Sequence, residues 1–259
     1  MSFDFIIPAE HPALAGHFPG KPIVPGALFL DELSRTLEQD IGRHLCSAKQ
    51  LRFSAPLLPM QRVRVEYTEK TASDYRFTAH ADGQPIAKGV LSSVTSSSPP
   101  PLINHGEHTA ATNTKPLYDR LPHQGDICLL DSITDYDSQN IYCLTKKPTT
   151  CPLRHHASLS PWVALEYAAQ ALACHGILNA TGNGGPDSMS SAWVIGVKYL
   201  HCLRPYLPQG NTEAYTIAAR ILAHQPGIAS YEFSLKDNDT CLAFGRLNVA
   251  FEIAQLLKP

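Results

Sequence analysis

The chain has 259 residues, enough for two domains of about 100–150 residues each. Hydrophobic residues make up 44% and charged residues 17%, a balance typical of a globular protein and not of a disordered one. The 21 basic and 23 acidic residues leave a net charge of −2, which argues against a nucleic-acid-binding protein, because such proteins neutralise many phosphates.

The N-terminal part of the chain is predicted to contain one helix and five strands. A strand over residues 3–8 comes first, and a helix over 26–45 follows, because its apolar residues recur at spacings of three and four. Those apolar residues are Leu30, Leu33, Leu37 and Ile41. The remaining strands are expected at 48–54, 62–69, 74–81 and 86–95.

Residues 96–116, SSSPPPLINHGEHTAATNTKP, are rich in Ser, Pro, Thr and Asn and contain few apolar side chains. Such a segment cannot bury enough surface to offset the entropy of ordering it, so we predict a linker. After it, a helix is expected over 161–180, with Ser160 as its cap and Pro161 in its first turn. Strands are expected at 127–134, 140–146, 191–200, 212–222, 229–236 and 241–252.

The two flanks of the linker repeat each other residue by residue. One block recurs 149 positions later and another 156 positions later, while Asp31 aligns with Glu166 at an offset of 135. The first block is Lys49, Leu51, Pro56 and Pro59, repeated as Lys198, Leu200, Pro205 and Pro208; the second is Tyr75, Phe77 and Gly89, repeated as Tyr231, Phe233 and Gly245. We therefore predict a duplicated α+β domain, with one copy in 1–95, the linker in 96–116 and the other copy in 117–259.

Cysteine usage and the N-terminus indicate a cytoplasmic protein. The seven cysteines form no C-x-x-C pair, and the closest two are eight residues apart, so we expect reduced thiols and neither a zinc site nor a disulfide framework. The first residues, MSFDFIIPAEHP, lack the basic and apolar regions of a signal peptide. The most apolar window, 161–178, contains Glu166 and His175, which favours a buried helix over a membrane span.

The most specific segment is GHFPGKPIVPGALFLD, residues 16–31. Its prolines and glycines predict a rigid loop that leads into a helix. His17 in the loop, the free N–H of Gly26 at the helix start and the Asp31 carboxylate could form an acid–base site. An equally good interpretation on these grounds is a tight turn before a core helix, with Asp31 solvated.

This segment resembles the signature of the bacterial 3-hydroxyacyl-[acyl-carrier-protein] dehydratases of the FabA/FabZ type, which have the hotdog fold. In that family a His-Phe loop leads through Pro-Gly into the central helix, and the catalytic acid follows the histidine by fourteen residues, the spacing of His17 and Asp31. The second half is similar to the same family through LPHQGDICLLDSI (121–133) and EYAAQ (166–170).

The departures from this pattern differ between the halves. Fourteen positions before Glu166 the chain has Pro152 instead of histidine, and Gly26 aligns with Pro161, which has no N–H. Because hotdog active sites take histidine from one hotdog and acid from the other, the resemblance implies one composite site. Its catalytic residues would be His17 and Glu166, with Gly26, Gln170, Phe18 and Pro25 binding substrate, and Asp31 would be a vestigial acid.

The chain also resembles the double-hotdog dehydratase domains of polyketide synthases and, more closely, a fusion of the two dehydratase subunits of aryl polyene pathways. The resemblance implies two long central helices wrapped by a joined antiparallel sheet, which is a pseudo-dimer within one chain, and a further homodimer is possible. The expected partner is an acyl carrier protein bearing a 3-hydroxyacyl thioester, with no nucleic acid and no membrane involved.

The implied reaction removes a C2 proton and the C3 hydroxyl of the thioester, and it requires neither a metal nor an organic cofactor. Neutral His17 would be the base, since an unperturbed histidine has a pKa of ~6.5. Glu166 would hold a proton, or orient a water that does, with a pKa raised by its apolar surroundings. The Gly26 N–H would bind the thioester oxygen.

Two other functions fit parts of the pattern. A hotdog thioesterase would use water to cleave the thioester, although thioesterases of this fold usually lack the full spacing from HFPG to the acid. A non-catalytic protein that binds the acyl carrier protein as a scaffold would have no reason to retain the residues of the composite site.

Overall fold

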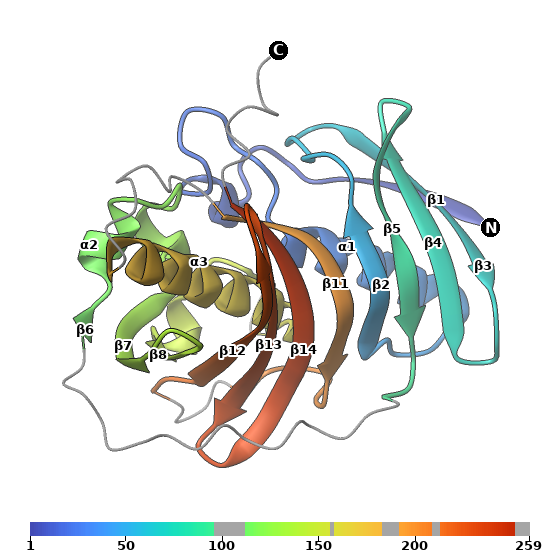
Figure 1. The fold of residues 1–259 in the computed structure, drawn as a ribbon. Coiled ribbons are helices and arrows are strands. Elements are labelled where there is room, and N and C mark those ends of the chain that lie inside the picture. Colours follow the sequence, from blue (N-terminus) through green and yellow to red (C-terminus); the bar gives the residue numbers. More distant parts are fainter. Residues whose placement is uncertain (96–111, 156–157, 183–191, 209–212, 252–259) are drawn as a thin grey trace.

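The computed structural model describes residues 1–95, 112–155, 158–182, 192–208 and 213–251. Its main feature is one curved sheet of twelve antiparallel strands, and two long helices lie on the same side of it (Figure 1). The strand order is β1-β3-β4-β5-β2-β11-β14-β13-β12-β8-β7-β6. This is the double hotdog that the sequence predicted.

The first half supplies β1 (Ser2–Ile6), α1 (Gly26–Ile41), β2 (Ser47–Phe53), β3 (Arg62–Glu69), β4 (Asp74–Ala81) and β5 (Gln84–Ser92). The second half supplies β6 (Thr112–Asn113), α2 (Lys115–Tyr118), β7 (Leu130–Tyr136), β8 (Asn140–Thr145), α3 (Ala164–Gly182), β11 (Ala192–Cys202), β12 (Thr216–Gln225), β13 (Ile228–Asp237) and β14 (Thr240–Phe251). A short hairpin of β9 (Arg154–His155) and β10 (Ser158–Leu159) stands apart from the large sheet.

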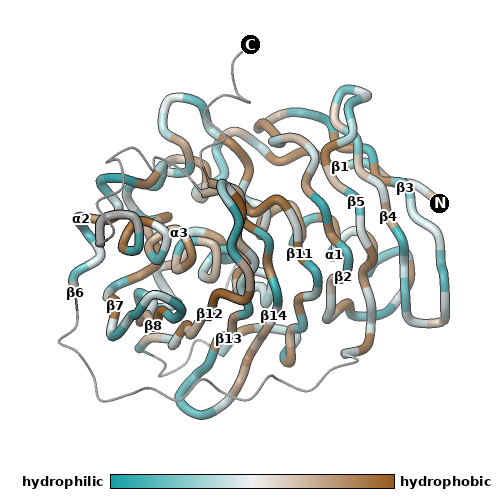
Figure 2. The backbone as a smooth tube through the Cα atoms, in the orientation of Figure 1, coloured by the Kyte–Doolittle hydropathy of each residue, from teal (hydrophilic) through white to brown (hydrophobic). Residues whose placement is uncertain are grey.

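The two halves are joined through β2 and β11. Five residue pairs connect these antiparallel strands, from Ser47 opposite His201 to Arg52 opposite Gly196. Side chains alternate between exposed and buried along strands such as β3, so the sheet has one apolar face toward the helices (Figure 2). Joining the halves in this way removes two strand edges that would otherwise be open to other chains.

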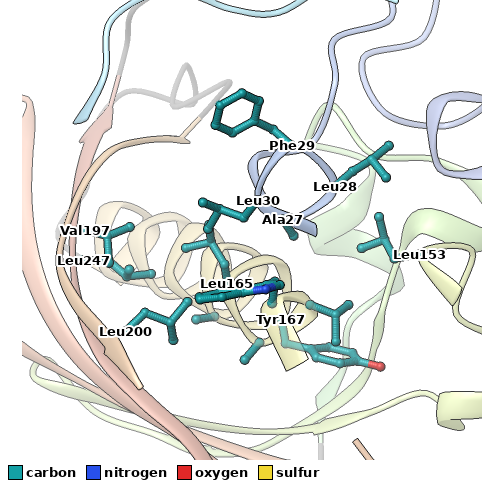
Figure 3. Packing of buried hydrophobic residues seen from close by; sticks show 14 of the residues in the cluster. Ala27, Leu28, Phe29, Leu30, Leu153, Leu165, Tyr167, Val197, Leu200 and Leu247 are labelled. Atoms are coloured by element: carbon teal, nitrogen blue, oxygen red, sulfur yellow. The ribbon is translucent and has the colours of Figure 1, made fainter. Parts of the chain in front are cut away.

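Both helices are held by their apolar side chains. In α1, Leu30, Leu33 and Leu37 are completely buried, as their spacing predicted. The start of α1 packs against the start of α3, and α3 in turn packs against β11 and β14, where Val197, Leu200 and Leu247 lie (Figure 3). One continuous cluster of buried apolar residues therefore includes both halves.

The duplication is visible at atomic distances. A Cβ built on Gly89 would lie 3.0 Å from the Cα of Leu51 and 3.3 Å from the Phe77 ring. A Cβ built on its repeat partner, Gly245, would lie 3.3 Å from the Cα of Leu200 and 2.9 Å from the Phe233 ring. These six residues are three of the repeat pairs in the sequence. Each glycine therefore makes room for the equivalent strand and the equivalent aromatic ring of its own half.

Several predicted ends differ from the structure. The helix predicted over 26–45 ends at Ile41, because Gly42 adopts a left-handed conformation (φ 66°) and its N–H caps the Glu38 carbonyl. The α-helix predicted from Pro161 begins at Ala164, after a 3₁₀ turn that the Ser160 side chain caps at the Trp162 N–H. The strand predicted at 127–134 begins at Leu130, because residues 125–127 form a 3₁₀ turn.

Most of the predicted linker, residues 96–111, lies outside the described residues, so the proposed domain division stays a prediction. Among the helices of the described segments, none combines the length and the apolar character needed to cross a membrane.

Candidate active site

The loop that carries His17 binds directly to a segment of the second half. The Gln124 N–H donates to the Gly16 carbonyl and the Phe18 N–H donates to the Pro122 carbonyl, each at 2.9 Å. Between these two hydrogen bonds, His17 lies opposite His123 in an isolated antiparallel bridge. A short backbone ladder therefore connects residues more than a hundred positions apart, and it sets their two imidazoles side by side.

Two local features of the sequence permit this contact. A Cβ on Gly16 would lie 1.8 Å from the Gln124 carbonyl oxygen, so only glycine fits there. The backbone of Phe18 has a φ of 60°, which residues other than glycine rarely adopt. Its ring lies against Trp193 of β11, with centroids 4.4 Å apart, and the edge of the His17 ring faces it at 4.9 Å. These aromatic contacts and the Pro122 hydrogen bond offset the backbone strain.

The His17 side chain is 7% exposed, and its tautomer is fixed. Its Nδ1–H donates to the Ile23 carbonyl at 2.6 Å, which leaves the lone pair on Nε2. Burial is the main reason that the pKa of His17 is lowered to about 4, and the neighbouring His123 acts in the same direction. At neutral pH His17 is therefore an uncharged imidazole that can accept a proton at Nε2.

Glu166 lies in the first turn of α3 and is 5% exposed. Its Oε1 accepts a hydrogen bond from Gln170 Nε2 at 2.9 Å and lies 3.4 Å from His123 Nε2. Burial raises the pKa of Glu166, but the hydrogen bond from His123, the positive charge that His17 carries at acidic pH and the hydrogen bond from Gln170 oppose it and lower the pKa to about 2. The expectation of a raised pKa was wrong, because it considered burial without these partners.

His123 is a site residue to which the sequence analysis gave no role. It is 8% exposed, its ring centroid lies 5.1 Å from that of His17, and it contacts Glu166. The segment LPHQGDICLLDSI had been matched to the family as a whole, so the signal was present in the resemblance. The spacing of residues along the chain could not show that His123 faces His17.

Gln170 lies beside Glu166 in a buried polar network. Its Oε1 accepts hydrogen bonds from the Tyr118 hydroxyl at 2.6 Å and from the Leu129 N–H at 2.9 Å. Its Nε2 donates to the Ile127 carbonyl as well as to Glu166. Gln170 is completely buried and is not among the residues that line the cavity. In this structure its side chain holds the Glu166 carboxylate, and its expected contact with substrate stays a prediction.

A cavity of about 1040 Å³ begins at these side chains and runs between the two halves. His17, Phe18, Gly26, His123 and Glu166 all line it, together with apolar residues of both halves. Of the expected substrate-binding residues, Phe18 and Gly26 line the cavity. Pro25 is buried behind it as the N-cap of α1 and does not. The volume is close to the upper end of the range of cavities that bind small organic ligands, roughly 300–1,000 Å³.

Asp31, the acid of the segment 16–31, lies outside the cavity. It is half-buried on α1 and does not line the cavity. Burial lowers the pKa of the nearby His11, and the Asp31 charge acts in the opposite direction. One turn further along α1, Arg35 pairs with Glu32 and donates a hydrogen bond at 2.6 Å to His155 of the second half. The structure thus separates Asp31 from His17 and brings Glu166 to it.

A metal ion is the other ligand that these groups could hold. Donor atoms of His17, His123 and Glu166 all lie within 4.8 Å of one another, and imidazole nitrogens and carboxylate oxygens are donors that zinc uses. The acid–base chemistry of the three groups does not need an ion, so we treat them as proton-transfer groups. The sequence prediction of no metal and no organic cofactor stays a prediction.

Comparison with family models gives two matches that divide the chain. Residues 115–258, more than half of it, match the model described as ApeP-like, ApeP dehydratase. Residues 1–90 match the model described as ApeI-like, ApeI dehydratase. The two matches fall on the two halves that the internal repeat predicted.

Individual proteins are similar over shorter stretches or in fold alone. The 3-hydroxyacyl-[acyl-carrier-protein] dehydratase FabZ of Anaeromyxobacter sp. (strain Fw109-5) is 30% identical over 96 residues, which cover 30% of this chain and 61% of that protein. The dehydratase domain of a mycocerosic acid synthase-like polyketide synthase superposes with a TM-score of 0.74 at 17% identity, over 96% of this chain and 90% of that one. A putative thioesterase from Novosphingobium aromaticivorans superposes at 0.60, with 14% identity, over 97% and 95% of the two chains. At these identities the two structures show the fold alone.

Replacing Gly16 by alanine should damage the site through the backbone. The new methyl group would meet the Gln124 carbonyl oxygen, so the loop must withdraw and His17 must leave His123. We expect the melting temperature to fall by roughly 2–12 °C, from about 1–3 kcal/mol of overpacking, and most of the activity to be lost. Gly20→Ala is the matched control, since Gly20 also lies in the loop, at φ 83° with nothing within 4 Å of its Cβ; it should cost about 1 kcal/mol and little activity. Equal effects of the two variants would contradict the close-approach argument.

Proposed function

Since the chain belongs to the ApeP-like dehydratase family, with an ApeI-like first half, we propose that it dehydrates a 3-hydroxyacyl thioester on acyl carrier protein to the trans-2-enoyl thioester. One observation supports this reaction above the others: a neutral histidine of the first half and a carboxylate of the second half meet in one buried cavity. The chemistry needs a base at C2 and a second polar group at the C3 hydroxyl, and here the two come from different halves.

In the proposed reaction, His17 Nε2 removes the C2 proton of the thioester. The hydrogen bond from Nδ1 to Ile23 stabilises the tautomer that this step requires and the imidazolium that it produces. Glu166, which is held by Gln170 and His123, lines the same cavity as His17 and interacts with the C3 hydroxyl. Holding both groups on opposed elements aligns them with the two substrate atoms that react.

The first turn of α1 is positioned to stabilise the charge that develops on the thioester oxygen. Gly26 is the first residue of this helix and lines the cavity, and N–H groups at a helix start have no acceptor within the helix. A donor of this kind is most effective when it is already in place before the charge forms. We assign the Gly26 N–H this role.

The proposed setting follows from the same resemblance. The partner is an acyl carrier protein, the two halves act as a pseudo-dimer within one chain, and the compartment is the cytoplasm. A further homodimer through an outer strand of the sheet is compatible with the proposal but not required by it. Contact with the carrier would involve basic residues such as Lys49, Arg52, Lys198 and Arg204.

Dehydration is tested by incubating the purified protein with a 3-hydroxyacyl-carrier protein and measuring the product mass. We expect a loss of one water from the carrier-bound acyl group, whereas a thioesterase would release a free acid and a scaffold would leave the substrate unchanged. His17→Ala should reduce turnover by at least ~10²-fold, the usual contribution of a general base. Dehydration by the folded variant at nearly the wild-type rate would contradict the assignment of His17 as the base.

The pH profile should show an unusually acidic lower limb. His17 must be neutral to act, and its pKa is lowered to about 4, so kcat/KM should stay nearly constant from pH 7 to about pH 5 and fall as His17 becomes protonated near pH 4. A histidine with an ordinary pKa would begin to lose activity near pH ~6.5. Circular dichroism at each pH separates this limb from acid unfolding. A limb near 6.5 in folded protein would contradict the buried, neutral state of His17.

The two carboxylates of the repeat should differ in importance. Glu166→Ala removes the carboxylate that contacts His123 and should lower turnover by ~10²-fold or more. Asp31→Ala should change turnover by only a few fold, because Asp31 lies outside the cavity, although some stability loss is expected. Both variants are first checked for folding by their melting temperatures. If Asp31→Ala abolishes turnover and Glu166→Ala leaves it nearly unchanged, the proposal of a composite site is wrong.

A further inference from the structure

Loss of water from a 3-hydroxyacyl thioester needs a proton for the departing hydroxyl, and this proton must come from a group in the cavity. The inference that follows rests on the proposed function and concerns the source of that proton. In the reaction, the C2–H electron pair forms the C2=C3 double bond, while the C3–O bond breaks with its pair on oxygen. The oxygen then leaves as water only if a proton joins it.

Few described residues of the cavity wall can exchange a proton. They are His17, Arg52, His123 and Glu166, because the rest of that wall is apolar or carries only hydroxyl, amide or indole groups. An arginine does not release a proton at any pH where the protein is folded. When the C2–H and C3–O bonds break together, His17 is accepting a proton and cannot supply one, and its remaining N–H is bonded to the Ile23 carbonyl.

Glu166 is a poor proton store in the free protein. It receives a hydrogen bond from Gln170 and lies against His123, and these partners favour its ionised form. Gln170 is itself held by Tyr118 and by the backbone, so it cannot turn away to release the carboxylate. Elimination therefore leaves His123 among the described residues that line the cavity.

The position of His123 suits a proton donor. Its Nε2 lies 3.4 Å from Glu166 Oε1, longer than the 2.7–2.9 Å usual for a charge-assisted hydrogen bond, so this N–H can turn to a third acceptor. Its Nδ1 is buried without a hydrogen-bond partner in the described protein. A buried imidazolium needs a negative charge nearby, and the Glu166 carboxylate supplies it.

We propose that His123, paired as an imidazolium with the Glu166 carboxylate, donates the proton that leaves with the C3 hydroxyl. His17 gains the C2 proton, and His123 loses one, so each turnover ends with the proton on the other histidine. The ring centroids of His17 and His123 are 5.1 Å apart, and a Glu166 carboxylate oxygen lies within 4.8 Å of a nitrogen of each ring. The proton can therefore return from His17 to His123 through the carboxylate or the product water. The site is thereby reset without net proton exchange with solvent.

The groups that face His123 determine when it carries its proton. His17 approaches it from the loop before α1, and Glu166 approaches it from α3. The third close neighbour, the Phe18 ring, is uncharged, with its centroid 6.2 Å away. Of these three groups, the Glu166 carboxylate is the one that can place a negative charge beside the His123 ring.

A substrate whose leaving group needs no proton separates this role from others. Chloride departs from a 3-chloroacyl thioester with its electron pair and needs no acid, whereas the hydroxyl does. For His123→Gln we expect kcat on the 3-hydroxyacyl-carrier protein to fall by at least ~10²-fold with KM changed by only a few fold. Elimination of chloride, corrected for the uncatalysed rate, should stay within about threefold of wild type. His17→Ala is the matched control and should lose both reactions.

Wild-type protein gives a second measurement that needs no variant. The kcat for the 3-hydroxyacyl substrate, whose leaving group needs a proton, should fall at alkaline pH, and this limb should be missing for the 3-chloroacyl substrate. Equal alkaline limbs for both substrates would overturn the proposal, as would a folded His123→Gln that dehydrates at the wild-type rate. Equal losses of both reactions in that variant would overturn it too, since His123 would then only position its neighbours. If wild type eliminates chloride but forms no enoyl thioester from the hydroxyacyl substrate, the proposed function itself fails.

Discussion

The short backbone ladder between residues 16–18 and 122–124 is the contact on which the rest of the site depends. Two hydrogen bonds of 2.9 Å hold these segments, and the absence of a side chain at Gly16 permits them. Because the ladder is made of backbone atoms, it sets the separation of the imidazoles of His17 and His123 more rigidly than side-chain contacts could. The joined sheet and the packed helix starts serve to bring the two segments within reach.

Once the ladder has formed, the electrostatics of the site follow from burial and from the order of the hydrogen bonds. Burial keeps His17 uncharged, while the partners of Glu166 keep it ionised, so the two groups differ in charge although they share one cavity. Both pKa values are lowered, so at neutral pH the cavity holds an uncharged base beside a carboxylate ion. The chain from Tyr118 through Gln170 to Glu166 ties this balance to α2 and α3, so the carboxylate is held by a buried network and not by its own rotamer preference.

The sequence predicted the fold because the repeat constrained it twice, with the same helix and the same strands in the same order. It also predicted that His17 and Glu166 would meet, since each half retained what the other lacked. Local signals were weaker at the ends of elements, where Gly42 and the turn at 161–163 decided the outcome. His123 was missed because its importance comes from a bridge across the chain. The pKa of Glu166 was wrong because hydrogen-bond partners cannot be counted before the fold is known.

The unequal halves explain why, among the described residues, a histidine and a carboxylate meet at His17 and Glu166 and not around Asp31. At the mirror position, Arg35 stands where the second half has Gln170, and its charge is paired with Glu32 and bonded to His155. An amide can hold a carboxylate while leaving it able to face a cavity, whereas a guanidinium with partners in both halves ties the helix surface to the opposite loop. That loop has Pro152 in place of the histidine, and Pro161 occupies the helix start. The mirror region thus forms a contact between the halves, in which Arg35 of α1 meets His155 of the second half.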